Sequence, residues 1–98
     1  MNPGKKFPSS INTMESNEII REQIFEIIKN QLISNTPPET NQTLKRLVEL
    51  GYSDQDARML IGQCLVVELF SVLKLAKPFN NERYVSNLNK LPEEPFDD

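Results

Sequence analysis

The chain of 98 residues has a formal net charge of −3 and is long enough for one domain of modest size. It has no histidine and a single cysteine, which excludes a Ser-His-Asp triad, histidine-containing or thiolate zinc sites and an intramolecular disulfide. From residue 15 to residue 91 it holds nine basic and ten acidic residues, so it lacks the basic surface that nucleic-acid binding requires.

The first predicted segments are a flexible arm over residues 1–14 and a helix over residues 16–34. Prolines, a glycine and serines without a period indicate the arm, and no apolar stretch follows Lys5 and Lys6, so we expect no secretory signal. In the helix, apolar residues recur at spacings of three and four, which is typical of one buried face. The stripe consists of Ile20, Ile24, Ile27, Ile28 and Gln31, and Ile19, Phe25, Leu32 and Ile33 widen it.

A capping box predicts the start of the second helix. Thr36 stands in the capping position, Pro37 fits the first helical position, and Glu39 completes the reciprocal pair. The helix should continue to Leu50, because Gly51 can adopt the left-handed conformation that ends helices. We expect its buried residues to be Leu44, Leu47, Val48 and Leu50.

Ser53, with Asp56 three residues later, predicts the N-cap of a third helix. The helix should run to residue 76 or 77, because Pro78 cannot continue it. Gly62 inside the helix indicates a close approach of another helix. The residues expected to face inward are Ala57, Leu60, Ile61, Cys64, Leu65, Val67, Val72 and Leu75.

Residues 64–76 are apolar on nearly every side of this helix. Such a helix is normally buried on several sides. In so short a protein it must be the central packing element or the seam with a second subunit. Because Glu68 and Lys74 interrupt the run, we expect no transmembrane span.

Asn80 or Asn81 is the predicted cap of a short last helix over residues 82–91, with Tyr84, Val85 and Leu88 directed inward. Residues 92–98 read as an acidic tail that contains proline. No strand pattern is present. The sequence therefore predicts an all-α fold: a helical domain over residues 15–91, built as a compact bundle of about four helices with a long central third helix.

Glu68 is the strongest candidate for chemistry, because its neighbours in the sequence and on the helix are apolar. A carboxylate in such a setting should pair with a cation or have a raised pKa. It could therefore serve as a ligand or catalytic group, forming a candidate polar site with Arg83 and Tyr84. Alternatively, it could lie at a solvent-facing edge of the helix, or pair with a basic residue and hold helices in register; the candidate cations are Arg21, Lys45, Arg58 and Arg83.

Residues 47–58 resemble the ubiquitin-associated type of three-helix module, in which a Leu-Gly-Tyr-like loop follows the first helix. The resemblance implies a peptide-binding module that uses the Gly51-Tyr52 loop. The second helix of that module is short, however, whereas the helix after Gly51 should run for about two dozen residues.

A longer stretch of the chain includes Asn30–Leu32, Thr36–Thr40, Gly51-Tyr52, Ile61-Gly62, Glu68, Pro78–Asn80, Glu82–Tyr84 and Leu91-Pro92. In these residues and their order it is similar to a family of small bacterial helical proteins that forms a domain of unknown function. The resemblance covers about 65 residues and implies a compact helical protein with no assigned activity. Some members carry histidines in the first and third helices, but the residues near the matching positions here are not good metal ligands (Arg21, Phe25, Gln55 and Met59).

We expect a cytoplasmic, non-enzymatic protein without a metal, cofactor, nucleic-acid or membrane partner. Its predicted function is to bind itself or another protein through a candidate interaction surface on the third helix: Val66, Leu69, Phe70 and Leu73. Self-association is expected because the third helix offers more apolar surface than three short partners can cover. The alternatives are a small-ligand binder or enzyme around Glu68, and the ubiquitin-associated-like peptide binder.

Overall fold

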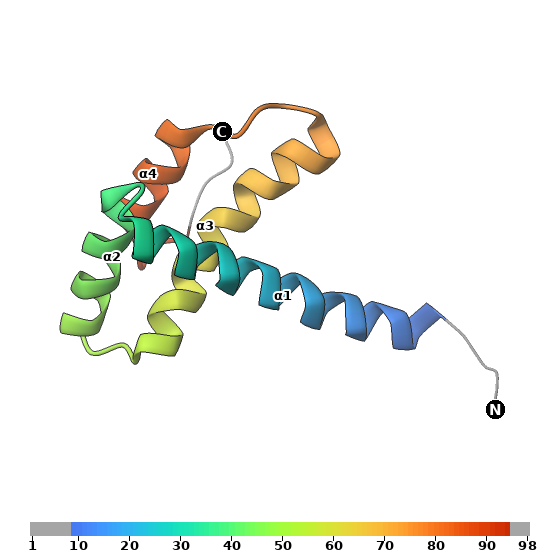
Figure 1. Cartoon of the computed structure of the whole chain (residues 1–98), viewed down its shortest axis with the longest axis horizontal. Helices are drawn as coiled ribbons and strands as arrows, with labels where there is room; N and C mark the ends of the chain where they lie inside the picture. Colours follow the sequence, from blue (N-terminus) through green and yellow to red (C-terminus); the bar gives the residue numbers. More distant parts are fainter. Residues whose placement is uncertain (1–8, 95–98) are drawn as a thin grey trace.

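The computed structural model describes the backbone of residues 9–94 and the side chains of residues 18–94. This part of the chain holds four helices and no strand: α1 (Ser9–Ser34), α2 (Pro38–Glu49), α3 (Asp54–Leu75) and α4 (Asn81–Lys90). The predicted all-α bundle is therefore confirmed. α3 is its centre, because it contacts α1, α2 and α4 and contributes more buried apolar residues than any other helix (Figure 1).

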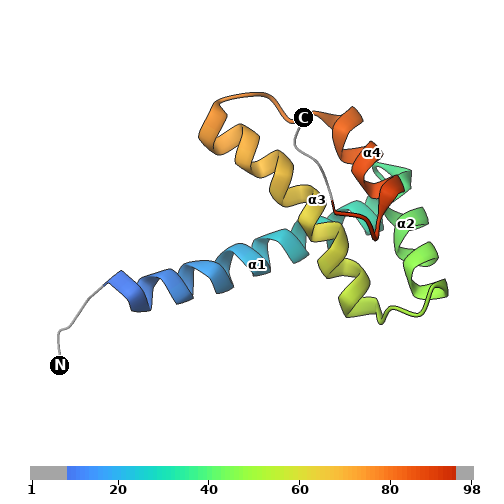
Figure 2. The same ribbon diagram turned by 180° about the vertical axis from the view of Figure 1, so that it is seen from behind.

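α1 begins at Ser9, within the predicted arm, and not at Ser16. The earlier start has a simple cause, because no proline or glycine interrupts the chain between Pro8 and Pro37. Residues 1–8 of that arm lie outside the described part of the chain. The end of α1 that leads into α2 packs on the body of the protein, and its N-terminal half projects away from it (Figures 1 and 2).

The predicted capping box at the start of α2 is wrong. Pro37 is the N-cap residue, with extended backbone, and no side chain caps the helix. The Thr36 hydroxyl instead donates a hydrogen bond of 3.2 Å backwards to the carbonyl oxygen of Ser34. Since Pro38 is the first helical residue, Glu39 does not stand at the position that a capping box requires.

The C-terminal end of α2 has the predicted stop but not the predicted burial. Gly51 has a φ of +111°, a conformation that glycine adopts readily. Val48 and Leu50 are exposed, contrary to expectation, and the buried residues are Thr40, Thr43 and Leu47. These three lie three and four residues apart, so they share the face of α2 that packs against the other helices.

The start of α3 and its close approach to α1 are confirmed. The Asp56 backbone N–H donates to the Ser53 hydroxyl oxygen at 3.0 Å. A Cβ atom at Gly62 would lie only 3.0 Å from Cγ2 of Ile24 on α1, so glycine permits the two helices to cross closely here. α3 ends at Leu75, one or two residues before the expected end, because Ala76 adopts a left-handed φ of +54°.

Asn80, one of the two asparagines expected to cap α4, is its N-cap residue. The Arg83 backbone N–H donates to Oδ1 of Asn80 at 3.0 Å, and the helix begins at Asn81. Tyr84 and Leu88 are buried as predicted, and Val85 is half-buried. In the predicted tail, Pro92, Glu93 and Glu94 are exposed, and residues 95–98 lie outside the described part.

The apolar core surrounds α3 as far as Leu65, and beyond that residue the fully buried side chains of the helix are those of Glu68 and Ser71. Val72 and Leu75, expected inside, are exposed, and so are Val66, Phe70 and Leu73. The described part of the chain therefore covers Cys64 and Leu65 but leaves most of the apolar side chains of residues 66–76 exposed. The buried apolar residues are Ile24, Ile28, Leu47, Ala57, Ile61, Cys64, Leu65, Tyr84, Leu88 and Leu91.

None of the helices in the described part of the chain combines the length and the apolar character that crossing a membrane would need.

The close crossing predicts that Gly62→Leu destabilises the protein. The larger side chain gains about 1 kcal/mol of helix propensity but must displace Ile24, and overpacking of this kind costs about 1–3 kcal/mol. Urea unfolding followed by circular dichroism should therefore show a lower midpoint. Gln63→Leu, on the exposed neighbouring residue, is the control and should change the free energy of unfolding by less than about 0.5 kcal/mol. Equal losses in the two variants would contradict a close crossing at Gly62.

Candidate functional site

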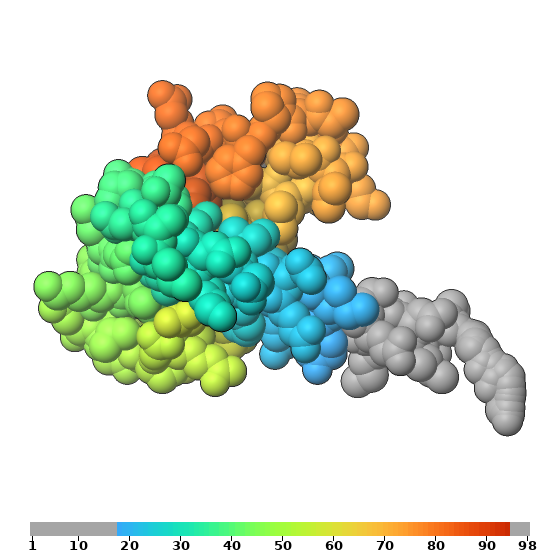
Figure 3. Space-filling view, in the orientation of Figure 1, coloured from blue at the N-terminus to red at the C-terminus, as the bar shows by residue number. Residues whose placement is uncertain are grey.

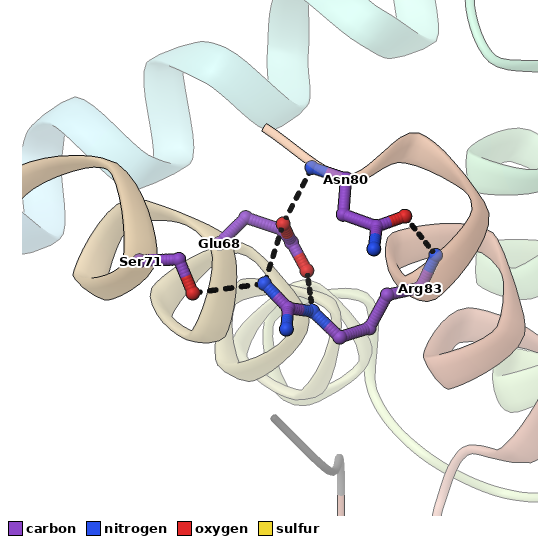
Figure 4. A network of polar contacts seen from close by, with 4 residues as sticks. All are labelled: Glu68, Ser71, Asn80 and Arg83. Atoms are coloured by element: carbon purple, nitrogen blue, oxygen red, sulfur yellow. Dashed lines mark hydrogen bonds and ion pairs between the residues drawn. The ribbon is translucent and has the colours of Figure 1, made fainter. Parts of the chain in front are cut away.

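Glu68, the predicted centre of chemistry, is fully buried and paired with Arg83. The guanidinium donates from Nε to Oε2 at 2.5 Å and from Nη2 to Oε1 at 3.1 Å. Oε1 also accepts the backbone N–H of Asn80 at 2.8 Å, and Nη2 donates to the Ser71 hydroxyl at 2.8 Å (Figure 4). Of the four cations considered from the sequence, Arg83 is the partner.

This cluster holds α4 on α3. Glu68 and Ser71 come from α3, Asn80 caps α4, and Arg83 lies in its first turn (Figure 4). A bidentate arginine–carboxylate pair has strict geometry, so it fixes the position of the connection between the two helices. Phe79, in that connection, contacts the Tyr84 ring edge to face with the centroids 5.6 Å apart. This ring contact adds to the attachment of the connection to α4.

The chemistry open to Glu68 is limited by these contacts. Both carboxylate oxygens already accept hydrogen bonds, and the side chain has no exposed surface. A ligand or substrate could reach it only after the Arg83 contact is broken. Removing one partner of a buried ion pair is costly, because the other charge remains buried without compensation. The arrangement is therefore suited to holding helices together.

Tyr84, the third residue of the predicted polar site, directs its hydroxyl away from the Glu68 cluster. It donates to Oε1 of Gln31 at 2.7 Å, and the Thr40 hydroxyl donates to the same oxygen at 2.7 Å. One amide oxygen therefore links α1, α2 and α4. Burial raises the pKa of Tyr84 to about 12, although the hydrogen bonds with Thr40 and Gln31 act in the opposite direction.

Arg46 of α2 makes a third polar contact that attaches α4, and the sequence pattern did not predict it. Its guanidinium donates to the carbonyl oxygens of Leu91 at 2.6 Å and Leu88 at 2.9 Å, at the C-terminal end of α4. The contact joins residues more than 40 positions apart, and no local spacing could have signalled it.

The predicted interaction surface on α3 is largely open to solvent. Val66 and Phe70 are about half exposed, Leu73 is 77% exposed, and Leu69 is half-buried. A shallow apolar groove of about 250 Å³ continues from Val66 to the crossing with α1. Its lining includes Ile20, Ile24, Phe25, Met59, Gly62 and Val66. The structure thus joins the predicted surface to the exposed part of α1.

The Gly51-Tyr52 loop does not present its aromatic ring as a peptide-binding loop would. Tyr52 is half-buried and packs against the core, and its backbone N–H donates to the Leu47 carbonyl oxygen at 3.1 Å. The following helix, α3, has 22 residues, in contrast to the short second helix of the ubiquitin-associated type. The local sequence similarity is thus accompanied by different packing.

Cys64 lies in the core, and burial raises the pKa of its thiol to about 12. A thiol with such a pKa remains protonated at neutral pH and is a poor nucleophile. In the part of the chain with described side chains, no three His, Cys, Asp or Glu residues form a group that could hold a metal ion.

Comparison with protein-family models, curated proteins and solved structures found no match to this chain. The similarity to a bacterial family of helical proteins therefore stays a prediction.

The buried pair predicts a large difference between two chemically equivalent substitutions. Glu68→Gln should lower the free energy of unfolding by about 3 kcal/mol, because the Arg83 charge stays mostly buried without its counter-ion. Asp54→Asn is the matched control: it breaks the exposed pair of Asp54 with Arg58, at 2.8 Å, and should cost less than about 1 kcal/mol. Urea unfolding measures both values, and similar losses would contradict the structural role of Glu68.

Tyr84 predicts a loss of stability at alkaline pH. Its pKa is raised from 10 to about 12 in the folded protein, so the unfolded chain releases this proton first. The stabilisation is complete below pH 10 and is lost as the pH rises towards about 12. Tyr84→Phe should remove this part of the pH dependence in urea unfolding and leave the part due to Cys64. A tyrosinate absorbance that develops fully near pH 10 in the native protein would contradict it.

Proposed function

We propose that the protein is a non-enzymatic interaction protein that binds another protein chain through one surface of α3. This surface, called here the α3 face, consists of Met59, Val66, Phe70 and Leu73, with Leu69 at its border. The observation that carries the proposal is that the C-terminal half of α3 has an inverted pattern. From residue 66 to the end of α3, the buried residues are polar and, apart from Lys74, the exposed residues are apolar.

The inversion is clear between residues 66 and 75. Glu68 and Ser71 are buried beneath α4 and its connection, whereas the exposed positions in the same turns include Val66, Phe70 and Leu73. A helix on the solvent-exposed surface of a globular protein has the opposite pattern, with apolar residues facing the core and polar residues facing the solvent. Contiguous exposed apolar side chains of this kind mark interaction sites in soluble proteins.

The α3 face is exposed because α1 leaves it. Val66 and Leu73 lie four and eleven residues after Gly62, so they continue the side of α3 that α1 covers at the crossing. Beyond that crossing the two helices diverge (Figures 1 and 2). From Met59 to Leu73 the face runs for about 21 Å at 1.5 Å per residue, which is enough for several turns of a partner helix.

The alternative of an enzyme or ligand binder around Glu68 has less support. Glu68 and Arg83 bind each other, Tyr84 binds Gln31, and all three side chains contribute to the attachment of α4. No side chain of the predicted polar site is thus left to recognise a substrate without loss of fold stability.

A photo-crosslinking residue at position 70 tests the proposal in cells that contain the protein. Phe70 lies on the α3 face, so the probe should form a defined crosslink to a protein chain, either a second copy or another protein. The same probe in place of Ile33, which is 73% exposed but lies on α1 away from this face, is the matched control. Mass spectrometry identifies the adducts. Equal crosslinking from both positions, or none from position 70, would contradict the proposal.

A further inference from the structure

We infer that the occupant of the α3 face is a second copy of this chain, placed so that α1 of each copy packs on the α3 face of the other. This inference rests on the proposed function and names its partner.

The first argument is that each copy has two exposed apolar surfaces, one on α1 and one on α3. Both are exposed because the two helices diverge beyond their crossing. Ile20 continues the α1 stripe of Ile24 and Ile28 past the crossing and is 52% exposed, just as Phe70 and Leu73 continue the α3 face in the other direction. The two helices that carry these surfaces diverge beyond their crossing (Figure 2), so the outer parts of the two surfaces do not cover each other within one chain. In a twofold dimer, each surface meets the other surface of the second copy, so both are covered at once.

The shape of the molecule is compatible with this dimer, in which the two copies exchange their α1 helices across the interface. The space-filling view shows a hollow between the exposed part of α1 and the C-terminal half of α3 (Figure 3). α1 also projects from the body, and no other helix of the described residues lies beside its N-terminal half (Figure 1). Isolated helices of about 12–15 residues are marginal in water, so such a projection gains stability when a second chain packs against it.

The third argument is charge complementarity. Residues 18–26 of α1 contain Glu18, Glu22 and Glu26 with only Arg21 in opposition, and residues 70–80 contain Lys74 and Lys77 with no acidic residue. Within the described side chains, none of these glutamates or lysines forms an ion pair. The glutamates lie on the side of α1 away from Ile20, so in the exchange the acidic segment of one copy lies at the rim of the interface, alongside the basic segment of the other. Pairing α1 with α1, or α3 with α3, brings like charges together.

Sedimentation equilibrium of the full chain tests the oligomeric state. The expected mass is that of a dimer, and Leu73→Asp should raise the dissociation constant by at least about 30-fold, as loss of a central apolar contact does. Ile33→Asp is the control, since it introduces the same charge at an equally exposed leucine-sized residue, and its dissociation constant should equal that of the wild type. Circular dichroism verifies that both variants are folded.

Charge reversal tests the arrangement of the two copies. Because these charges lie at the rim, Lys74→Glu with Lys77→Glu should weaken the dimer about threefold at low salt, and Glu18→Lys with Glu22→Lys should do the same. Combining all four substitutions should restore the affinity, because each segment again meets the opposite charge. A combination that is weaker than either pair would overturn the arrangement.

The outcomes separate this inference from the proposed function. A monomer at all concentrations, together with a crosslink from position 70 to a different protein, overturns the second copy and leaves the interaction function in place. A monomer without any such crosslink overturns both. A dimer that Leu73→Asp does not weaken overturns the inference, because the contact then lies on another surface.

Discussion

The crossing of α1 over α3 at Gly62 is the constraint on which the rest of the architecture depends. The close contact with Ile24 brings the two longest helices together at one point, and the angle between them separates their remaining lengths. On one side of this point α2 and α4 complete an apolar core around α3. On the other side no element of the described chain is left to fill the space. The same contact therefore determines where the core ends and where the exposed apolar surface begins.

α4 has only ten residues, and polar contacts compensate for its small apolar area. Its N-terminal end is held by Glu68 and Asn80, its centre by the Gln31 amide, and its C-terminal end by Arg46. Buried polar groups are tolerated when every partner is satisfied, and together they specify one position for the helix. This explains why a glutamate, an arginine and a tyrosine that resemble a reactive site in the sequence act instead as supports.

The sequence predicted the helices and several of their ends, but it did not predict which residues of different helices contact one another. Gly51, Ser53 and Asn80 act through local backbone chemistry, so their roles as stop or cap could be recognised from a few neighbouring residues. The Glu68–Arg83 pair was one of several possibilities, because spacing alone cannot choose between cations on different helices. The links from Arg46 to Leu91 and from Gln31 to Tyr84 join distant residues and left no local signal. Burial of Val72 was wrongly expected because apolar composition does not show where a neighbouring helix turns away.

The inverted pattern of α3 has a consequence for folding. In an ordinary surface helix, apolar burial beneath the helix stabilises each turn. In the last turns of α3 the residues beneath the helix are Glu68 and Ser71, so an ion pair and hydrogen bonds take that role in the single chain. Their net contribution is small, because the desolvation of buried charges offsets most of the attraction. The C-terminal part of α3 is consequently the segment whose stability gains most from a bound partner, since binding to the folded form shifts the equilibrium towards it.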